Sequence, residues 1–167
     1  MPTITHRHQL KLKVAKALLK KMEETLNLNL SYIFGDKPRI EVAKTSFGNL
    51  IIVNGRAIAI KLDEETIPTL IFSQAISKLP KVIVDMGAIP HICNGADVMA
   101  PGIVRVEGEF GEGAITLIVD ERYGKPLAIG RALMDSDRLR MIKRGRVVKN
   151  IHYVGDKIWR LIKEISR

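Results

Sequence analysis

A histidine and two aspartates lie near one another in the sequence, and these residue types could carry out proton chemistry. His91 is six residues after Asp85 and six before Asp97, and a histidine–carboxylate pair can act as a general base. Asp85 could also be the catalytic aspartate of a uridine-modifying enzyme, but a chain of 167 residues has no room for a large base-flipping domain. No serine or cysteine nucleophile is clearly placed beside His91. We therefore predict that Asp85 caps a helical turn near Gly87 and that the protein is not an enzyme.

The sequence predicts neither a metal site nor a cofactor. Cys93 is the single cysteine, which rules out an internal disulfide and a zinc site built from several cysteines. It is expected to be a small buried apolar residue. His6 and His8 offer too few ligands for a metal and are expected in a frayed N-terminus, while His152 is expected in packing or in a turn. Glycine-rich phosphate loops of the G-x-x-x-x-G-K-[ST] and G-x-G-x-x-G types are absent from the sequence.

Gly87-Ala88 has little side-chain bulk at the point where a strand is expected to turn into a short helix. Backbone N–H groups exposed there would let a phosphate or a base approach closely. Tight packing of the turn is the alternative reason for two small residues. Farther along, Pro101-Gly102 is typical of a turn, because proline presets φ and glycine accepts positive φ.

A second candidate site is the basic segment that follows Asp137. Six cationic side chains fall within twelve residues: Arg138, Arg140, Lys143, Arg144, Arg146 and Lys149. We expect a short helix over 138–143, capped by Ser136-Asp137 and closed by Gly145. Arginine binds phosphate through charge-assisted bidentate hydrogen bonds, so RNA binding here should depend strongly on salt. Aromatic residues are only 5% of the chain, which favours recognition of backbone and shape over a stacking platform.

The overall charge favours a polyanionic partner, with nucleic acid preferred to a membrane surface. The formal net charge is +9. Residues 121–167 hold thirteen Lys and Arg against five Asp and Glu, and residues 1–26 hold six against two. A generally basic, solvated surface without a binding role is the alternative. The sequence shows no signal peptide and no apolar run of membrane-spanning length, so a cytoplasmic protein is expected.

The first half of the chain predicts a small α+β unit. A helix is expected over 9–26, where apolar residues recur every three or four positions. Its lysines occupy the other faces, which are either solvated or lie along phosphates. Asn54-Gly55 is a strong hairpin signal, and Pro68 is expected in the first turn of a helix that continues to residue 76. The other expected elements are extended segments at 31–33, 38–43, 50–53 and 56–62.

Lys78-Leu79-Pro80 marks the expected domain boundary, because proline ends the preceding helix and the pattern changes to short strands. Two domains, 1–78 and 79–167, are therefore predicted. The second should be a small barrel or sandwich, with strands at 81–84, 103–106, 114–119, 127–134, 147–148 and 151–153. The glycine-rich segment 107–113 is expected to be a flexible hairpin tip, and 158–165 to be either a closing strand or a short helix.

Several short motifs, taken together, resemble one family. In chain order they are Val53-Asn-Gly55, Pro68-Thr-Leu70, Val84-Asp-Met-Gly-Ala-Ile89, Gly95-Ala96, Met99 with Pro101-Gly102, and Asn150-Ile-His-Tyr153 with Trp159. Residues 84–103 resemble the opening of a PUA domain, a small β-barrel associated with structured RNA. The motifs over nearly the whole chain resemble the malignant-T-cell-amplified-sequence family of translation factors. Archaeal members of that family are short stand-alone proteins, and the same two-domain unit opens the eukaryotic factor ligatin.

The resemblance implies an α+β N-terminal pre-PUA domain followed by a mostly-β PUA pseudo-barrel. It also implies binding to the small ribosomal subunit and to tRNA, with a partner protein that bears an initiation-factor-like domain. Related PUA domains hold RNA beside the turn after their first strand, which places Gly87, Ala88 and His91 next to the ligand. The remaining expected RNA-binding residues are basic, namely Lys81, Arg138, Arg140, Lys143, Arg144 and Arg146.

We therefore expect a non-catalytic RNA-binding protein that acts on the acceptor end of tRNA at the small ribosomal subunit, in initiation or in post-termination recycling. No cofactor, membrane or small-molecule substrate is expected. The main alternative is an accessory module that delivers RNA to a modification enzyme or a ribonucleoprotein. Two further alternatives are a small enzyme that uses Asp85 and His91, and an adaptor whose basic surface meets an acidic protein.

Overall fold

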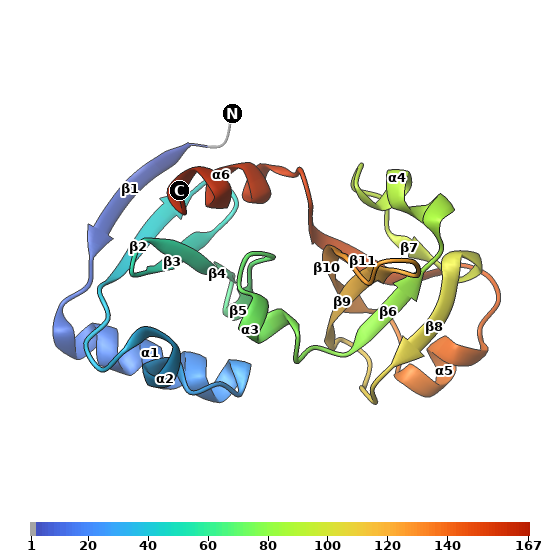
Figure 1. The fold of residues 1–167 in the computed structure, drawn as a ribbon, viewed down its shortest axis with the longest axis horizontal. Helices are drawn as coiled ribbons and strands as arrows, with labels where there is room; N and C mark the ends of the chain where they lie inside the picture. Colours follow the sequence, from blue (N-terminus) through green and yellow to red (C-terminus); the bar gives the residue numbers. More distant parts are fainter. Residues whose placement is uncertain (1–2) are drawn as a thin grey trace. The chain divides into compact units, whose positions relative to one another are not determined.

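The computed structural model describes residues 3–167, and these group into two compact units (Figure 1). The first unit runs to Ala75 and also includes residues 160–167, while residues 76–159 form the second. The division predicted after residue 78 had assigned the whole C-terminus to the second domain. In the structure the last residues pack with the first unit, where Ser166 Oγ accepts a hydrogen bond from the Ala57 N–H at 3.0 Å.

The first unit is built on a five-stranded antiparallel sheet in the order β1-β2-β3-β4-β5. Its strands are β1 (Ile4–Gln9), β2 (Ile40–Thr45), β3 (Asn49–Val53), β4 (Arg56–Leu62) and β5 (Glu65–Pro68). The hairpin predicted at Asn54-Gly55 is confirmed. Both turn residues have positive φ, 50° and 83°, as this type of two-residue connection requires.

The helices of this unit are α1 (Leu12–Leu26), α2 (Leu30–Phe34) and α3 (Ser73–Ile76). Ala15 and Met22 of α1 are buried in one hydrophobic cluster with Ile51, Val53 and Ile58 of the sheet. Because apolar residues recur at helical spacing, α1 buries one face, and its four lysines are all exposed. This confirms the predicted amphipathic helix, although it begins at Leu12 and not at residue 9.

Three local predictions for the first unit are wrong. His6 and His8 do not fray; they lie in β1, which pairs with β2 and so has backbone partners. The segment 31–33 is helical and not extended, because the Asn29 side chain caps α2 by accepting a hydrogen bond from the Tyr32 N–H at 3.0 Å. Pro68 ends the edge strand β5 opposite Ala59 and does not start a helix, a position where a missing N–H is tolerated.

The second unit contains a six-stranded mixed sheet in the order β7-β11-β10-β9-β6-β8. The strands are β6 (Lys81–Val84), β7 (Val98–Met99), β8 (Ile103–Glu107), β9 (Ile115–Asp120), β10 (Pro126–Ala132) and β11 (Arg146–Tyr153). The helical segments are η1 (Met86–Ala88), α4 (Ile89–Ile92), η2 (Ala100–Gly102), α5 (Ser136–Met141) and α6 (Lys157–Ile165), whose later residues belong to the first unit. Of the two possibilities left open for 158–165, the helix is the one observed.

Strand β6 lies inside this sheet, parallel to β9 and antiparallel to β8. Since β8 and β9 are therefore not neighbours, the connection 107–113 is not a hairpin tip as predicted. This connection is held against α5 by a hydrogen bond, which the Phe110 N–H donates to Ser136 Oγ at 3.0 Å. The two short strands predicted at 147–148 and 151–153 form one strand, β11.

The core of the second unit joins strands inside the sheet to helix α5. Val82 and Val84 of β6, Ile118 of β9, Val148 of β11 and Leu139 of α5 all belong to one buried cluster. The observed architecture, an α+β unit followed by a mostly-β half-barrel, confirms the predicted fold class. Within residues 3–167, the helices are too short or too polar to cross a membrane.

Candidate nucleic-acid interface

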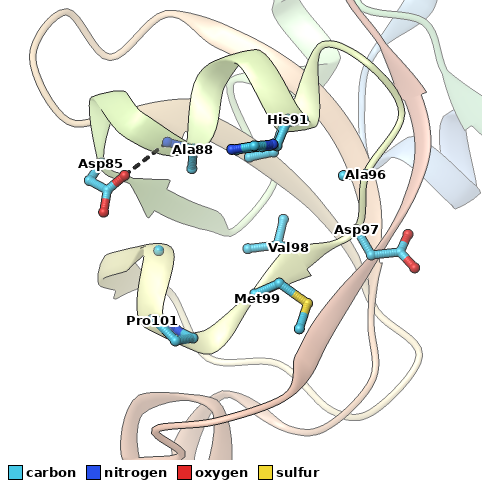
Figure 2. A pocket seen from close by; sticks show the side chains of 10 residues that line it. Asp85, Ala88, His91, Ala96, Asp97, Val98, Met99 and Pro101 are labelled. Atoms are coloured by element: carbon cyan, nitrogen blue, oxygen red, sulfur yellow. Dashed lines mark hydrogen bonds between the residues drawn. The ribbon is translucent and has the colours of Figure 1, made fainter.

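One end of the second unit carries a cleft of about 470 Å³. Figure 2 shows η1 and α4 on one side of it, and β7 with η2 on the other. Ten residues line the cleft: Asp85, Ala88, His91, Ile92, Ala96, Asp97, Val98, Met99, Pro101 and Gly102. All of them come from one continuous segment, residues 85–102, so the turns that follow β6 build the site.

Asp85 organises the first wall of the cleft. Its Oδ1 accepts a hydrogen bond from the Ala88 N–H at 2.9 Å, so it is the N-cap of η1, as predicted. Its own N–H donates to the Gly102 carbonyl at 2.9 Å, which ties this wall to the opposite one. A Cβ at Gly102 would lie 3.4 Å from the Ala88 Cβ, so the two walls come within van der Waals distance of each other here.

The end of the cleft is held by Asp97 and by its partners in β11. Asp97 Oδ1 accepts from the Asn150 N–H at 2.8 Å, and Oδ2 accepts from the Arg146 guanidinium at 3.1 Å. The Asn150 side chain donates in turn to the carbonyls of Ile92 and Ala96, both at 3.0 Å. These bonds fix the loop between α4 and β7, and Figure 2 shows the Asp97 carboxylate turned away from the centre of the cleft.

The chemistry of the cleft suits a flat, partly apolar group better than a phosphate. Val98, Met99 and Pro101 face Ala88 and His91 across it (Figure 2), and Met99 is half exposed. A planar ring could pack between these walls while His91, whose side chain is exposed, supplies a hydrogen bond. The Ala88 N–H is already bonded to Asp85, and the Asp85 carboxylate would repel an anion, so phosphates fit outside the cleft.

Cys93 and His152 are held in structural roles. Cys93 is partly buried, and this burial raises the pKa of its thiol, which disfavours the reactive thiolate. The His152 imidazole is buried against the Asp156 carboxylate, with Nδ1 at 3.0 Å from Oδ2. Among residues 3–167, no three His, Cys, Asp or Glu side chains are grouped so that they could hold a metal ion.

Comparison with protein families assigns both parts of the chain. The PUA domain model matches residues 80–154, and a domain of unknown function, DUF1947, matches residues 6–74. An uncharacterised protein of Methanocaldococcus jannaschii is 39% identical over 93% of this chain and 96% of its own length. The malignant T-cell-amplified sequence 1 homolog of Dictyostelium discoideum is 30% identical, with 73% of this chain and 70% of that protein covered. The chain belongs to the malignant T-cell-amplified sequence 1 family.

Further proteins are similar to this chain in sequence or in fold. Translation machinery-associated protein 20 of Saccharomyces cerevisiae is 28% identical over 86% of this chain and 84% of that protein. A hypothetical protein of Pyrococcus horikoshii superposes with a TM-score of 0.78 at 36% identity, covering 94% of this chain and 99% of that one. The cleft thus lies in the PUA domain of a malignant T-cell-amplified sequence 1 relative.

The residues predicted to bind RNA do not all meet at the cleft of this PUA domain. Ala88 and His91 line it, and Gly87 is exposed beside Ala88. Lys81 lies at the opposite end of β6, paired with Glu107. Its Nζ donates to the carbonyls of Ser77 and Leu79, at 3.1 and 3.4 Å.

The five basic residues predicted in 138–146 differ in how they are held. Arg146 is bonded to Asp97 of the cleft, and Lys143 and Arg144 are exposed just before it in the chain. Arg138 is exposed on α5. Arg140 is engaged within the fold, since its guanidinium donates to Glu109 and the Gly108 carbonyl, both at 2.8 Å.

One exposed element beside the cleft was not foreseen from the sequence, namely the turn 120–125 between β9 and β10. Asp120 accepts backbone hydrogen bonds from Tyr123 at 2.5 Å, Arg122 at 2.9 Å and Lys125 at 3.0 Å. These bonds, led by the one from Tyr123, lower the pKa of Asp120 and outweigh the opposing effect of burial. The sequence signal that could have indicated this turn is an aspartate followed four residues later by a glycine, with an arginine, a tyrosine and a lysine in the same segment.

Proposed function

We propose that this protein is a non-catalytic RNA-binding factor of translation that holds tRNA at the small ribosomal subunit, in initiation or in post-termination recycling. The cleft would receive an unpaired nucleotide from the acceptor end. The exposed cations near it, Lys143, Arg144 and Arg146, would bind the phosphates.

The cleft at 85–102 is the observation that carries this proposal. It combines apolar walls with an exposed His91, and it lies in the part of the chain that the PUA model matches. The Arg146 guanidinium is bonded to Asp97 at the end of the cleft, so positive charge begins where the acidic, apolar cleft ends. Relatives named for the translation machinery, which match most of this chain, favour a translation role over other uses of RNA.

The proposed role requires no chemical step from the protein. Asp85 acts as a helix cap, one oxygen being occupied by the Ala88 N–H, and burial disfavours the thiolate of Cys93. Binding of backbone phosphates by several cations predicts an affinity that falls steeply as salt is raised. A partner protein with an initiation-factor-like domain would complete the complex on the ribosome.

A binding experiment with two matched pairs of variants tests the RNA surface. Lys143→Glu with Arg144→Glu should weaken tRNA binding at least tenfold and reduce the salt slope by about 2. Lys13→Glu with Lys20→Glu, on the exposed face of α1, changes the net charge equally and should leave most of the affinity. Equal losses of affinity in both pairs of variants would mean that tRNA binding depends only on the overall charge of the protein.

The cleft itself is tested by filling it. Ala96 is exposed where it lines the cleft, so Ala96→Phe should block a nucleotide without disturbing the core. Ala17→Phe, at an exposed position of α1, is the control. Unchanged tRNA affinity in Ala96→Phe would remove the cleft from the proposal.

Sedimentation of a lysate through a sucrose gradient at low salt tests the ribosomal part. The protein should migrate with small subunits, and RNA crosslinked to it should include tRNA ends. Light fractions that contain one defined RNA and a catalytic protein would favour the accessory-module alternative instead.

A further inference from the structure

The turn 120–125 presents an aromatic ring that has no packing role in its own unit. Tyr123 is 74% exposed, whereas the backbone beneath it is held by the three hydrogen bonds to Asp120. Gly124 completes the turn with a φ of +63°, a conformation that glycine adopts at little cost. The ring is therefore carried by a fixed backbone and is open to a ligand.

The position of this turn in the sheet puts it at the same end as the cleft. Strands β6 and β9 run parallel, with Val84 opposite Asp120. The segments that follow these two strands therefore leave the sheet at the same end. The Glu121 N–H donates to the Val84 carbonyl at 2.9 Å. Asp85, which lines the cleft, is the next residue after Val84. Tyr123 is only two residues from Glu121, at most about 7 Å of extended chain.

The charges around the ring favour a nucleic acid. Arg122 and Lys125 flank Tyr123 and are exposed, and within the described part of the chain neither side chain is in an ion pair. The turn also holds two acidic residues, of which Glu121 is exposed and Asp120 is buried. An aromatic ring between two cations can stack on a base while the cations contact the phosphates on either side. An acidic peptide would use the cations and leave the ring without a role.

We propose that Tyr123 stacks on one unpaired nucleobase of the RNA held at the cleft, with Arg122 and Lys125 on its flanking phosphates. This inference rests on the proposed function, because it needs RNA at the neighbouring cleft. It adds a second contact point on the bound strand, and it assigns a selectivity: RNA with a single-stranded extension binds better than the same RNA with a blunt end.

The experiment compares two RNA hairpins, one with a blunt stem and one with a 3′ extension of a few adenosines. Binding of each is measured for the full chain and for Tyr123→Leu, Tyr123→Phe and Tyr32→Leu. Tyr32 is the matched control, because it is an 89% exposed tyrosine on α2 in the first unit. Tyr123→Phe and Tyr32→Leu should keep the wild-type preference for the extended hairpin, and Tyr123→Leu should reduce this preference by about 5- to 100-fold.

The outcomes separate the two proposals. If wild type binds neither hairpin, the proposed function fails. If Tyr123→Leu keeps the full preference for the extension, or weakens both hairpins equally, the stacking contact is wrong although RNA binding stands. If Arg122→Ala with Lys125→Ala abolishes binding to poly-glutamate and leaves both hairpins unaffected, the turn is a site for an acidic protein.

Discussion

The Asp97 carboxylate, in the loop after α4, accepts a hydrogen bond from the backbone N–H of Asn150 in β11 at 2.8 Å. The two residues are 53 positions apart in the chain, and their bond fixes the end of the cleft to a strand inside the sheet. Because the Asn150 side chain also holds the carbonyls of Ile92 and Ala96, the shape of the cleft depends on β11 as much as on the segment that lines it.

Replacing Asp97 with alanine should therefore loosen the cleft. The Asn150 N–H would lose its acceptor, and the free energy of unfolding should fall by about 1–3 kcal/mol. Urea denaturation measures this loss, and faster amide hydrogen exchange at 93–97 would report the local opening. Arg146→Ala removes a partner that is 62% exposed and should cost about 0–1 kcal/mol. A loss as large as that of Asp97→Ala would contradict this assignment.

Asp85 should tolerate asparagine but not alanine. Asparagine keeps a side-chain oxygen for the Ala88 N–H, whereas alanine removes the cap and should lower the free energy of unfolding by about 0.5–2 kcal/mol. Thermal or urea unfolding of both variants distinguishes them. If Asp85→Asn were as destabilised as Asp85→Ala, the negative charge and not the cap would be the stabilising feature.

The turn that carries Tyr123 should make stability depend on pH in the acid range. Backbone hydrogen bonds lower the pKa of Asp120 in the folded protein, so its ionised form is favoured by folding. That contribution is fully present above the unfolded pKa of about 3.9 and is lost as the pH falls through the lower folded value. The difference in unfolding free energy between wild type and Asp120→Asn should therefore shrink below about pH 4. A difference that stays constant with pH would contradict this role.

Arg140 should matter for stability where Arg138 does not. The Arg140 guanidinium donates to Glu109 and to the carbonyls of Val106 and Gly108, so Arg140→Ala should cost about 1–2 kcal/mol of unfolding free energy. Arg138 is exposed on the same short helix, and its alanine variant should stay within about 0.5 kcal/mol of wild type. Equal effects in urea denaturation would show that the Arg140 bonds contribute nothing.

Features encoded by adjacent residues could be predicted from the sequence. Asn54-Gly55 specifies its hairpin because both residues accept positive φ. Asp85 could be identified as a cap because its carboxylate accepts from the Ala88 N–H, a donor only three residues later in the chain. The long apolar periodicity of α1 was also sufficient, since a helix of 15 residues repeats its pattern several times.

Features that depend on short segments or on distant partners could not be predicted. Helix α2 has five residues, too few to show a period, and its cap at Asn29 resembles an ordinary turn residue. Arg140 was expected to bind phosphate because the sequence does not show that Glu109, 31 residues earlier, lies beside it. Tyr123 was missed because its place near the cleft follows from the parallel pairing of β6 and β9, which no local pattern announces.

Amide NMR of the full chain titrated with tRNA would test the central claim most directly. If the cleft and its rim bind RNA, the perturbed amides should lie in 86–102, in 122–125 and in 143–146, while the lysine-rich face of α1 stays unchanged. Perturbations confined to residues 11–21, or no perturbation at low salt, would contradict an RNA site in the PUA domain.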